Sequence, residues 1–169
     1  LINSAGLYAS IVANSIEELN KKFIPQTYFA KGNYFGVSKD LGIRHLIYPI
    51  PVGFGLGIHL TLEMDNTIKF GPDVEWVDKI NDYEVNENKK EEFLREIIKY
   101  IPTLDPNLLA ANYSGIRPIM NKKDKSMRDF IINTEKDHNI SGLINLYGIE
   151  SPGLTSSLSL SKHITENYI

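Results

Sequence analysis

Apolar residues recur at helical spacing in three stretches of the chain. The spacing predicts one helix over residues 7–20, a second over 86–101, and a third from Ser151 through Ile164. In the third helix, Ser151 is a suitable N-cap and Pro152 suits the first helical position. The apolar positions that define the three faces are Leu7, Ile11, Val12, Ile16 and Leu19; Phe93, Leu94, Ile97, Ile98 and Ile101; and Leu154, Leu158, Leu160 and Ile164.

Alternation of apolar and polar residues predicts a half-buried strand over residues 58–64, with Met64 on its apolar face and His59 on its polar face. A turn at residues 65–67 leads into a strand at 68–72, which makes a hairpin. The chain opens with the end of a buried strand that turns at Gly6. Strands are also predicted at residues 29–37, 45–50, 113–120, 130–132 and 143–147.

A run of alternating glycines occupies residues 53–57. A phosphate-binding loop needs three glycines spread over six positions and a helix directly after them. This run lacks that spacing and precedes a strand, so we interpret it as a flexible crossing between strands. Residues 121–126 are predicted to form a solvated loop.

The composition is typical of a globular protein without a strong charge. The 169 residues are 42% hydrophobic and 23% charged, with a formal net charge of -3. This balance leaves no basic field for a phosphate backbone, which argues against a nucleic-acid partner. The absence of cysteine excludes disulfides and thiolate chemistry, and the four histidines have no close metal-ligand spacing, so we expect no metal site.

No apolar run approaches the roughly 18 residues that a membrane-spanning helix needs, and the N-terminal residues lack the features of a signal peptide. We therefore expect no membrane span and a cytoplasmic location. The chain begins at Leu1 without methionine, as if within a strand. We expect it to be a fragment of a longer protein.

Three features could carry chemistry. Residues 150–155 place a strand directly before a helix start, where free backbone N–H groups and the helix dipole can hold an anion; an ordinary helix cap is the alternative. Arg117 precedes a proline, and its planar fork suits a carboxylate or a surface ion pair. His59 could be a general base or a solvated histidine on a polar strand face.

Five blocks in order along the chain carry a family resemblance. Together they are similar to the FAD-dependent oxidoreductases around L-2-hydroxyglutarate dehydrogenase, within the D-amino-acid oxidase and glycine oxidase superfamily. The resemblance covers nearly the whole chain. The blocks are residues 2–9, residues 48–49 with 55–61, residues 70–76, residues 113–118 and residues 148–155.

The resemblance implies an α+β fold with a mixed, mainly antiparallel sheet and flanking helices, together with pieces of an incomplete FAD-binding Rossmann-like domain. Residues 1–24 would be a late strand and helix of the FAD domain. Residues 25–143 would form the substrate-binding or cap domain, and residues 144–169 would return to the FAD domain.

The resemblance also implies a site. The predicted FAD contacts are Ser4, Ala5, Gly6, Gly148, Ser151, Gly153, Leu154 and Thr155. The family's N-terminal glycine-rich loop, which cradles the FAD pyrophosphate, has no counterpart in these residues. We therefore expect the chain alone to bind FAD poorly, to be inactive and to need an N-terminal FAD-binding half.

The implied chemistry is hydride transfer from the α-carbon of a small 2-hydroxy acid to flavin N5. Arg117 would hold the substrate carboxylate, His59 would accept the hydroxyl proton, and Tyr48 would contact the substrate. The alternative within the superfamily is a fragment of a D-amino-acid or glycine oxidase, whose amino acid substrate would need no such base. Two other hypotheses stay open: a non-catalytic module that binds a small carboxylate, and a structural fragment that is stable only as a homo-oligomer.

Overall fold

The structure is a computed structural model that describes residues 1–50, 57–122 and 129–169. The described chain divides into two compact units. Unit 1 contains residues 1–29 and 117–169, and unit 2 contains residues 30–116. Residues 117–143 thus group with the two chain ends, because strand β7 (Ile131–Asn133) pairs with strand β8 (Ile144–Tyr147). The assignment of FAD and substrate to particular domains stays a prediction.

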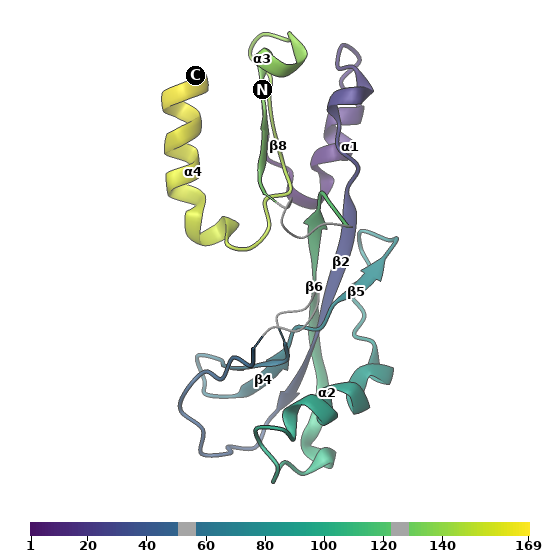
Figure 1. Ribbon diagram of the computed structural model, residues 1–169, viewed down its shortest axis with the longest axis vertical. Coiled ribbons are helices and arrows are strands. Elements are labelled where there is room, and N and C mark those ends of the chain that lie inside the picture. The colour runs from purple at the N-terminus through teal and green to yellow at the C-terminus, as the bar shows by residue number, and fades with distance from the viewer. Residues whose placement is uncertain (51–56, 123–128) are drawn as a thin grey trace. The chain divides into compact units, whose positions relative to one another are not determined.

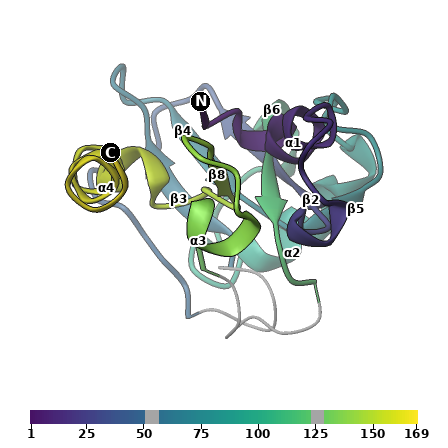
Figure 2. The same cartoon turned by 90° about the horizontal axis from the view of Figure 1, so that it is seen from above.

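Unit 1 is built on a three-stranded sheet in the order β1-β8-β7. Strand β1 (Ile2–Asn3) runs parallel to β8 (Ile144–Tyr147), and β7 (Ile131–Asn133) runs antiparallel to β8. All four residues of β8 are buried. Helices α1 (Ala9–Asn14) and α4 (Gly153–Tyr168) lie on opposite sides of β8 in both views (Figures 1 and 2). A strand covered on both faces has no polar alternation, as is typical of parallel sheets.

Each face of β8 belongs to a separate apolar cluster. Tyr147 packs with Ala9 and Ala13 of α1, whereas Leu146 packs with Ile164 of α4. The short helix α3 (Glu135–His138) has Thr134 as its N-cap, and the hydroxyl and amide of Thr134 form a capping box with Asp137. Packing on both faces therefore fixes the position of β8 and of the residues that follow it.

Two helix predictions in unit 1 need correction. The predicted helix over 7–20 begins with the 3-10 turn η1 (Gly6–Tyr8) and ends at Asn14, because the Ser15 N–H turns back to the Ala13 and Val12 carbonyls. A second 3-10 turn, η2 (Lys21–Phe23), follows.

At the other end of the chain, Pro152 rather than Ser151 occupies the N-cap position of α4, because its ψ of 43° is not helical. The apolar face predicted for this helix is only partly buried. Leu154 and Leu158 are almost fully exposed, whereas Leu160 and Ile164 pack against the sheet.

Unit 2 is built on a five-stranded sheet in the order β3-β4-β2-β5, with β6 paired to β2. Helix α2 follows the 3-10 turn η3 (Glu87–Lys89), and its Phe93 and Ile97 bury against Phe35, Leu60 and Phe70. The Phe35 and Phe93 rings lie 4.7 Å apart, which fixes the helix on one sheet face. The elements are β2 (Tyr28–Val37), β3 (His59–Leu62), β4 (Ile68–Gly71), β5 (Glu75–Val77), α2 (Lys90–Ile97), η4 (Pro106–Leu108) and β6 (Leu109–Ile119).

The predicted hairpin is confirmed, since β3 and β4 pair antiparallel with His59 opposite Gly71. Met64 is wrong as a core residue: β3 ends at Leu62 and Met64 is fully exposed. The predicted strand at 45–50 reduces to one bridge between Ile47 and Leu60.

The predicted helix over 86–101 is α-helical only within α2, although Phe93, Ile97 and Ile101 are buried as expected. Ile98 is exposed, so the buried face of this helix is narrower than the spacing of the apolar residues predicts. Most of the glycine run, residues 53–56, and residues 123–126 of the predicted solvated loop lie outside the described part of the chain.

Candidate functional site

The two segments predicted to contact the cofactor meet at one edge of the unit 1 sheet. Ser4, Ala5 and Gly6 follow β1, and residues 148–155 follow β8. Because β1 and β8 are parallel neighbours, with Asn3 opposite Asn145, both segments leave from the carboxyl edge. Ligands of open α/β sheets bind at this edge. The structure thus brings together residues that lie more than half the chain apart in sequence.

Each of the two segments at this edge contains a glycine with positive φ. Gly6 has a φ of +58° and Gly148 a φ of +66°. A Cβ at Gly148 would lie 2.5 Å from Met120 Cγ, whereas a Cβ at Gly6 would meet no atom within 4 Å. Gly148 is therefore closely packed by its own unit, and the Gly6 turn has open space beside it in the structure.

A buried asparagine pair ties the first turn to the sheet. Asn3 Nδ2 donates to Asn145 Oδ1 at 2.9 Å and to the Ala9 carbonyl at 2.8 Å, and Asn3 Oδ1 accepts from the Ala5 N–H at 3.3 Å. The side chain thus links β1, β8 and α1 at the point where the predicted cofactor turn begins. Sequence reasoning missed this role; its signal is a pair of polar residues within two otherwise apolar strands.

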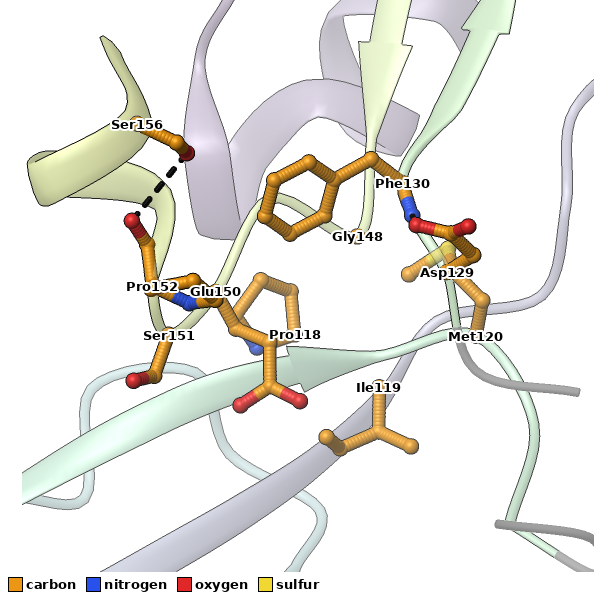
Figure 3. A pocket seen from close by; sticks show the side chains of 10 residues that line it. All are labelled: Pro118, Ile119, Met120, Asp129, Phe130, Gly148, Glu150, Ser151, Pro152 and Ser156. Atoms are coloured by element: carbon orange, nitrogen blue, oxygen red, sulfur yellow. Dashed lines mark hydrogen bonds between the residues drawn. The ribbon is translucent and has the colours of Figure 1, made fainter. Parts of the chain in front are cut away.

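A cavity of about 320 Å³ opens beside the second turn in unit 1 (Figure 3). Its wall combines the Phe130 ring and two prolines with Asp129 and Glu150, and Figure 3 shows these side chains around it. Two predicted cofactor residues, Gly148 and Ser151, belong to this wall. The lining residues are Pro118, Ile119, Met120, Asp129, Phe130, Gly148, Glu150, Ser151, Pro152 and Ser156.

The start of α4 is tightly turned. The Gly153 N–H donates to the Glu150 carbonyl, and the Ser156 hydroxyl donates to the Pro152 carbonyl at 3.1 Å. The Gly153 amide is therefore already hydrogen-bonded within the turn. It could donate to an anion only if its bond to the Glu150 carbonyl were broken or shared. Leu154 and Thr155, in the first turn of the helix, are exposed.

Arg117 forms an ion pair with Glu150 in unit 1. The Arg117 Nη1 atom lies 3.2 Å from Glu150 Oε2, and the two side chains are 36% and 19% exposed. The contact uses one nitrogen of the guanidinium fork. Ion pairing was one of the two alternatives for Arg117, and the partly exposed guanidinium still has the donors that a second carboxylate would need.

In unit 2 the structure brings Tyr48 and His59 together. Their rings stack with centroids 4.1 Å apart and an interplanar angle of 20°. His59 begins β3, half buried, and Tyr48 lies mostly in solvent. The two residues predicted for the substrate side of this unit therefore form one aromatic surface.

Buried polar groups hold the strands on either side of this surface. The Tyr100 hydroxyl donates to the Ile58 carbonyl at 2.9 Å, directly before His59, and burial raises the pKa of Tyr100 well above its usual value. After β4, Asp73 accepts hydrogen bonds from the Asn33 backbone and side chain, and burial raises the pKa of its carboxyl despite these bonds.

Residues 1–50, 57–122 and 129–169 contain neither a metal-binding cluster nor a membrane-spanning helix. No group of three or more histidine or acidic side chains is placed to hold a metal ion. None of the helices in these ranges is long and apolar enough to cross a membrane.

Comparison with known proteins shows the family of the chain. The family of FAD-dependent oxidoreductases called DAO matches residues 1–167. The chain belongs to this family. A bound FAD would find backbone groups at the paired strand ends, open space beside the Gly6 turn and a cavity beside the Gly148 turn, so these residues fit the cofactor.

Three proteins illustrate the similarity. The mitochondrial L-2-hydroxyglutarate dehydrogenase of Arabidopsis thaliana is 42% identical over 180 residues, which is 100% of this chain and 37% of that protein. The glycerol 3-phosphate dehydrogenase of Caloramator mitchellensis is 29% identical over 98% of this chain and 33% of its own length. A dithionite-reduced L-α-glycerophosphate oxidase from Mycoplasma pneumoniae with FAD bound superposes with a TM-score of 0.78 at 23% identity, covering 97% of this chain and 41% of its own.

These findings confirm the predicted family and the mixed α/β architecture with an antiparallel sheet. The chain spans about two fifths or less of each of these three proteins. The activity of a whole protein, its substrate and its partners are therefore matters for proposal.

Proposed function

We propose that this chain supplies the flavin-contacting strand ends and part of the substrate site of an FAD-dependent dehydrogenase that oxidises a small 2-hydroxy acid, such as L-2-hydroxyglutarate, to the 2-oxo acid. The observation that carries the proposal is the 42% identity to an L-2-hydroxyglutarate dehydrogenase along the entire chain. The meeting of both predicted cofactor segments at one sheet edge also supports it.

The cofactor side of the proposal uses unit 1. Ser4, Ala5 and Gly6 after β1, and Gly148, Ser151, Gly153, Leu154 and Thr155 after β8, would hold FAD through backbone groups and small side chains. FAD, when bound, supplies a hydride acceptor. We also propose that an FAD-binding segment outside these residues completes the cofactor site, and that the chain alone is inactive.

Arg117 in unit 1 and His59 in unit 2 are the residues proposed to act on the substrate. Arg117 would bind the carboxylate beside the reacting carbon, with Glu150 fixing one side of its fork. His59 would accept the hydroxyl proton as the hydride leaves C2 and the C–O bond becomes a carbonyl. Tyr48 stacks on the His59 ring and so limits the directions in which the imidazole can point.

The exposed leucines of α4 indicate where another chain or segment could pack. Leu154 and Leu158 are 91% and 85% exposed on one helix. Apolar groups exposed in this way favour association, which supports the predicted homo-oligomer or a further segment covering the helix.

Flavin reduction without oxygen tests the function. We expect L-2-hydroxyglutarate to bleach the flavin of the FAD-loaded holoenzyme within the time of a few turnovers, and glycerol 3-phosphate to leave it oxidised. Bleaching by glycerol 3-phosphate alone would assign the chain to the chemistry named for the second relative. A flavin that neither compound reduces, while 2-hydroxyglutarate still binds, would favour the non-catalytic carboxylate-binding module.

A further inference from the structure

The hairpin of unit 2 presents a second charged group on the same face as His59. In the β3–β4 register, His59 lies opposite Gly71 and Thr61 lies opposite Lys69. Residues opposite each other in an antiparallel pair share a face, so His59 and Lys69 are diagonal neighbours, about 7–8 Å apart at Cα. The opposite face holds Leu60 and Phe70 in the core.

Aromatic residues from two other strands surround the Lys69 ammonium. Tyr34 of β2 and Tyr113 of β6 stack with ring centroids 4.5 Å apart and an interplanar angle of 8°. Lys69 Nζ lies 4.9 Å from the Tyr113 centroid and 5.7 Å from that of Tyr34, and it donates to the Tyr113 hydroxyl at 3.1 Å. These contacts fix the direction of a side chain that is otherwise flexible.

A carboxylate already occupies the remaining side of the ammonium. Glu63, just past the end of β3, forms an ion pair with Lys69, and its own side chain is 41% exposed against 18% for Lys69. Burial lowers the pKa of Lys69, but the bonds to Glu63 and Tyr113 outweigh it and raise the pKa above its usual value, so the ammonium stays charged at neutral pH. The more exposed Glu63 side chain can turn into water when a second carboxylate takes its place at the ammonium, because the largely buried charge of Lys69 then keeps a partner.

We propose that Lys69 binds the distal carboxylate of a 2-hydroxydicarboxylic acid, and that Glu63 holds this position when no substrate is bound. The inference rests on the proposed function and deepens it, because it names the residue that selects a dicarboxylate. A substrate whose hydroxyl faces His59 extends along the strand toward Lys69, and a few carbon–carbon bonds separate these two groups in a five-carbon dicarboxylate. The charge and the fixed position of Lys69 then reject chains with an apolar end.

Two substitutions with opposite effects test the inference in the FAD-loaded holoenzyme. The substrates are L-2-hydroxyglutarate and L-2-hydroxyvalerate, which has the same carbon chain without the distal carboxylate. Lys69→Gln should raise the KM for hydroxyglutarate about tenfold or more, as expected for loss of a charge-assisted bond. Glu63→Gln should lower that KM several-fold, because the competing carboxylate is gone. Neither variant should change the KM for hydroxyvalerate appreciably, and Lys69→Arg should restore most of the affinity.

Binding of glutarate, followed by the change it causes in the flavin spectrum, gives a readout that needs no turnover. If the holoenzyme oxidises neither hydroxy acid but glutarate binding still depends on Lys69, the proposed function fails and the inference stands. Equal changes for both hydroxy acids, or a Glu63→Gln variant with unchanged or weaker glutarate binding, would overturn the inference. The Glu63 variant decides the matter even if Lys69→Gln does not fold.

Discussion

The two units place their candidate functional groups by different means. In unit 1 these groups follow the ends of two parallel strands, and most of what they offer is backbone: two glycine turns and the start of α4. In unit 2 they are alternate side chains on one face of an antiparallel hairpin, whose other face packs against α2. The candidate site in unit 1 therefore depends mainly on the conformation of the backbone, and the candidate site in unit 2 depends mainly on the chemistry of its side chains.

This difference separates two classes of mutation. A change at a strand end in unit 1 should act through the conformation of the chain and through cofactor occupancy. A change on the hairpin face that carries His59 and Lys69 should leave the fold and the flavin in place and alter the reaction or the choice of substrate. Arg117 is an exception within unit 1, because its proposed role belongs to its side chain.

The largest effect is expected at Arg117. Arg117→Met should lower kcat/KM for the 2-hydroxy acid by on the order of 100-fold or more, since a charged bond to the substrate is lost. Arg117→Lys keeps the charge without the planar fork and should recover only part of this loss. The measurement is steady-state kinetics of the FAD-loaded holoenzyme.

Glu150→Gln provides the matched control for that prediction. It removes the ion-pair partner of Arg117 but leaves the guanidinium in place. We expect a change of only a few-fold. If Glu150→Gln and Arg117→Met were equally damaging, and a lowered thermal midpoint accompanied both, Arg117 would be a structural partner of Glu150 and not a substrate ligand.

A smaller effect is expected from the glycines of unit 1. Gly148→Ala combines a φ of +66° with a Cβ placed 2.5 Å from Met120, and it should cost roughly 1–3 kcal/mol of stability beyond the strain of the φ value alone. Gly6→Ala has a similar φ but open space, and the strain alone should cost roughly 1–2 kcal/mol. Thermal midpoints and FAD content measure both. Equal losses at the two positions would show that the packing against Met120 is unimportant.

The sequence predicted the parts of this fold that depend on local pattern. Alternation over residues 58–64 and the turn at 65–67 were enough to predict the β3–β4 hairpin, because the register of a half-buried hairpin is set locally. Helix lengths were overestimated. Apolar spacing continued past Asn14, yet Leu19 reaches the core from a series of turns and not from a helix.

The site was harder to predict than the fold. The five blocks identified the segments at residues 4–6 and 148–155, but only strand pairing shows that both leave from one sheet edge. Lys69 was not recognised, because its partners Tyr34 and Tyr113 come from strands distant in sequence. The Asn3–Asn145 bond likewise joins residues 142 positions apart. The local pattern marks Asn3 and Asn145 as polar residues in apolar strands, but it does not show which residues they contact.

The most direct test of the division of roles between the two units is the His59→Gln variant of the holoenzyme. FAD content and the rate of flavin reduction by L-2-hydroxyglutarate are measured on the same sample. We predict full FAD content, an unchanged flavin spectrum and a reduction rate lower by on the order of 100-fold or more, as expected for loss of a general base. Reoxidation of the reduced flavin should be normal. A reduction rate equal to that of the unmodified protein would contradict the role of His59 as the base. It would also show that the hairpin face with His59 and Lys69 does not carry the proton transfer.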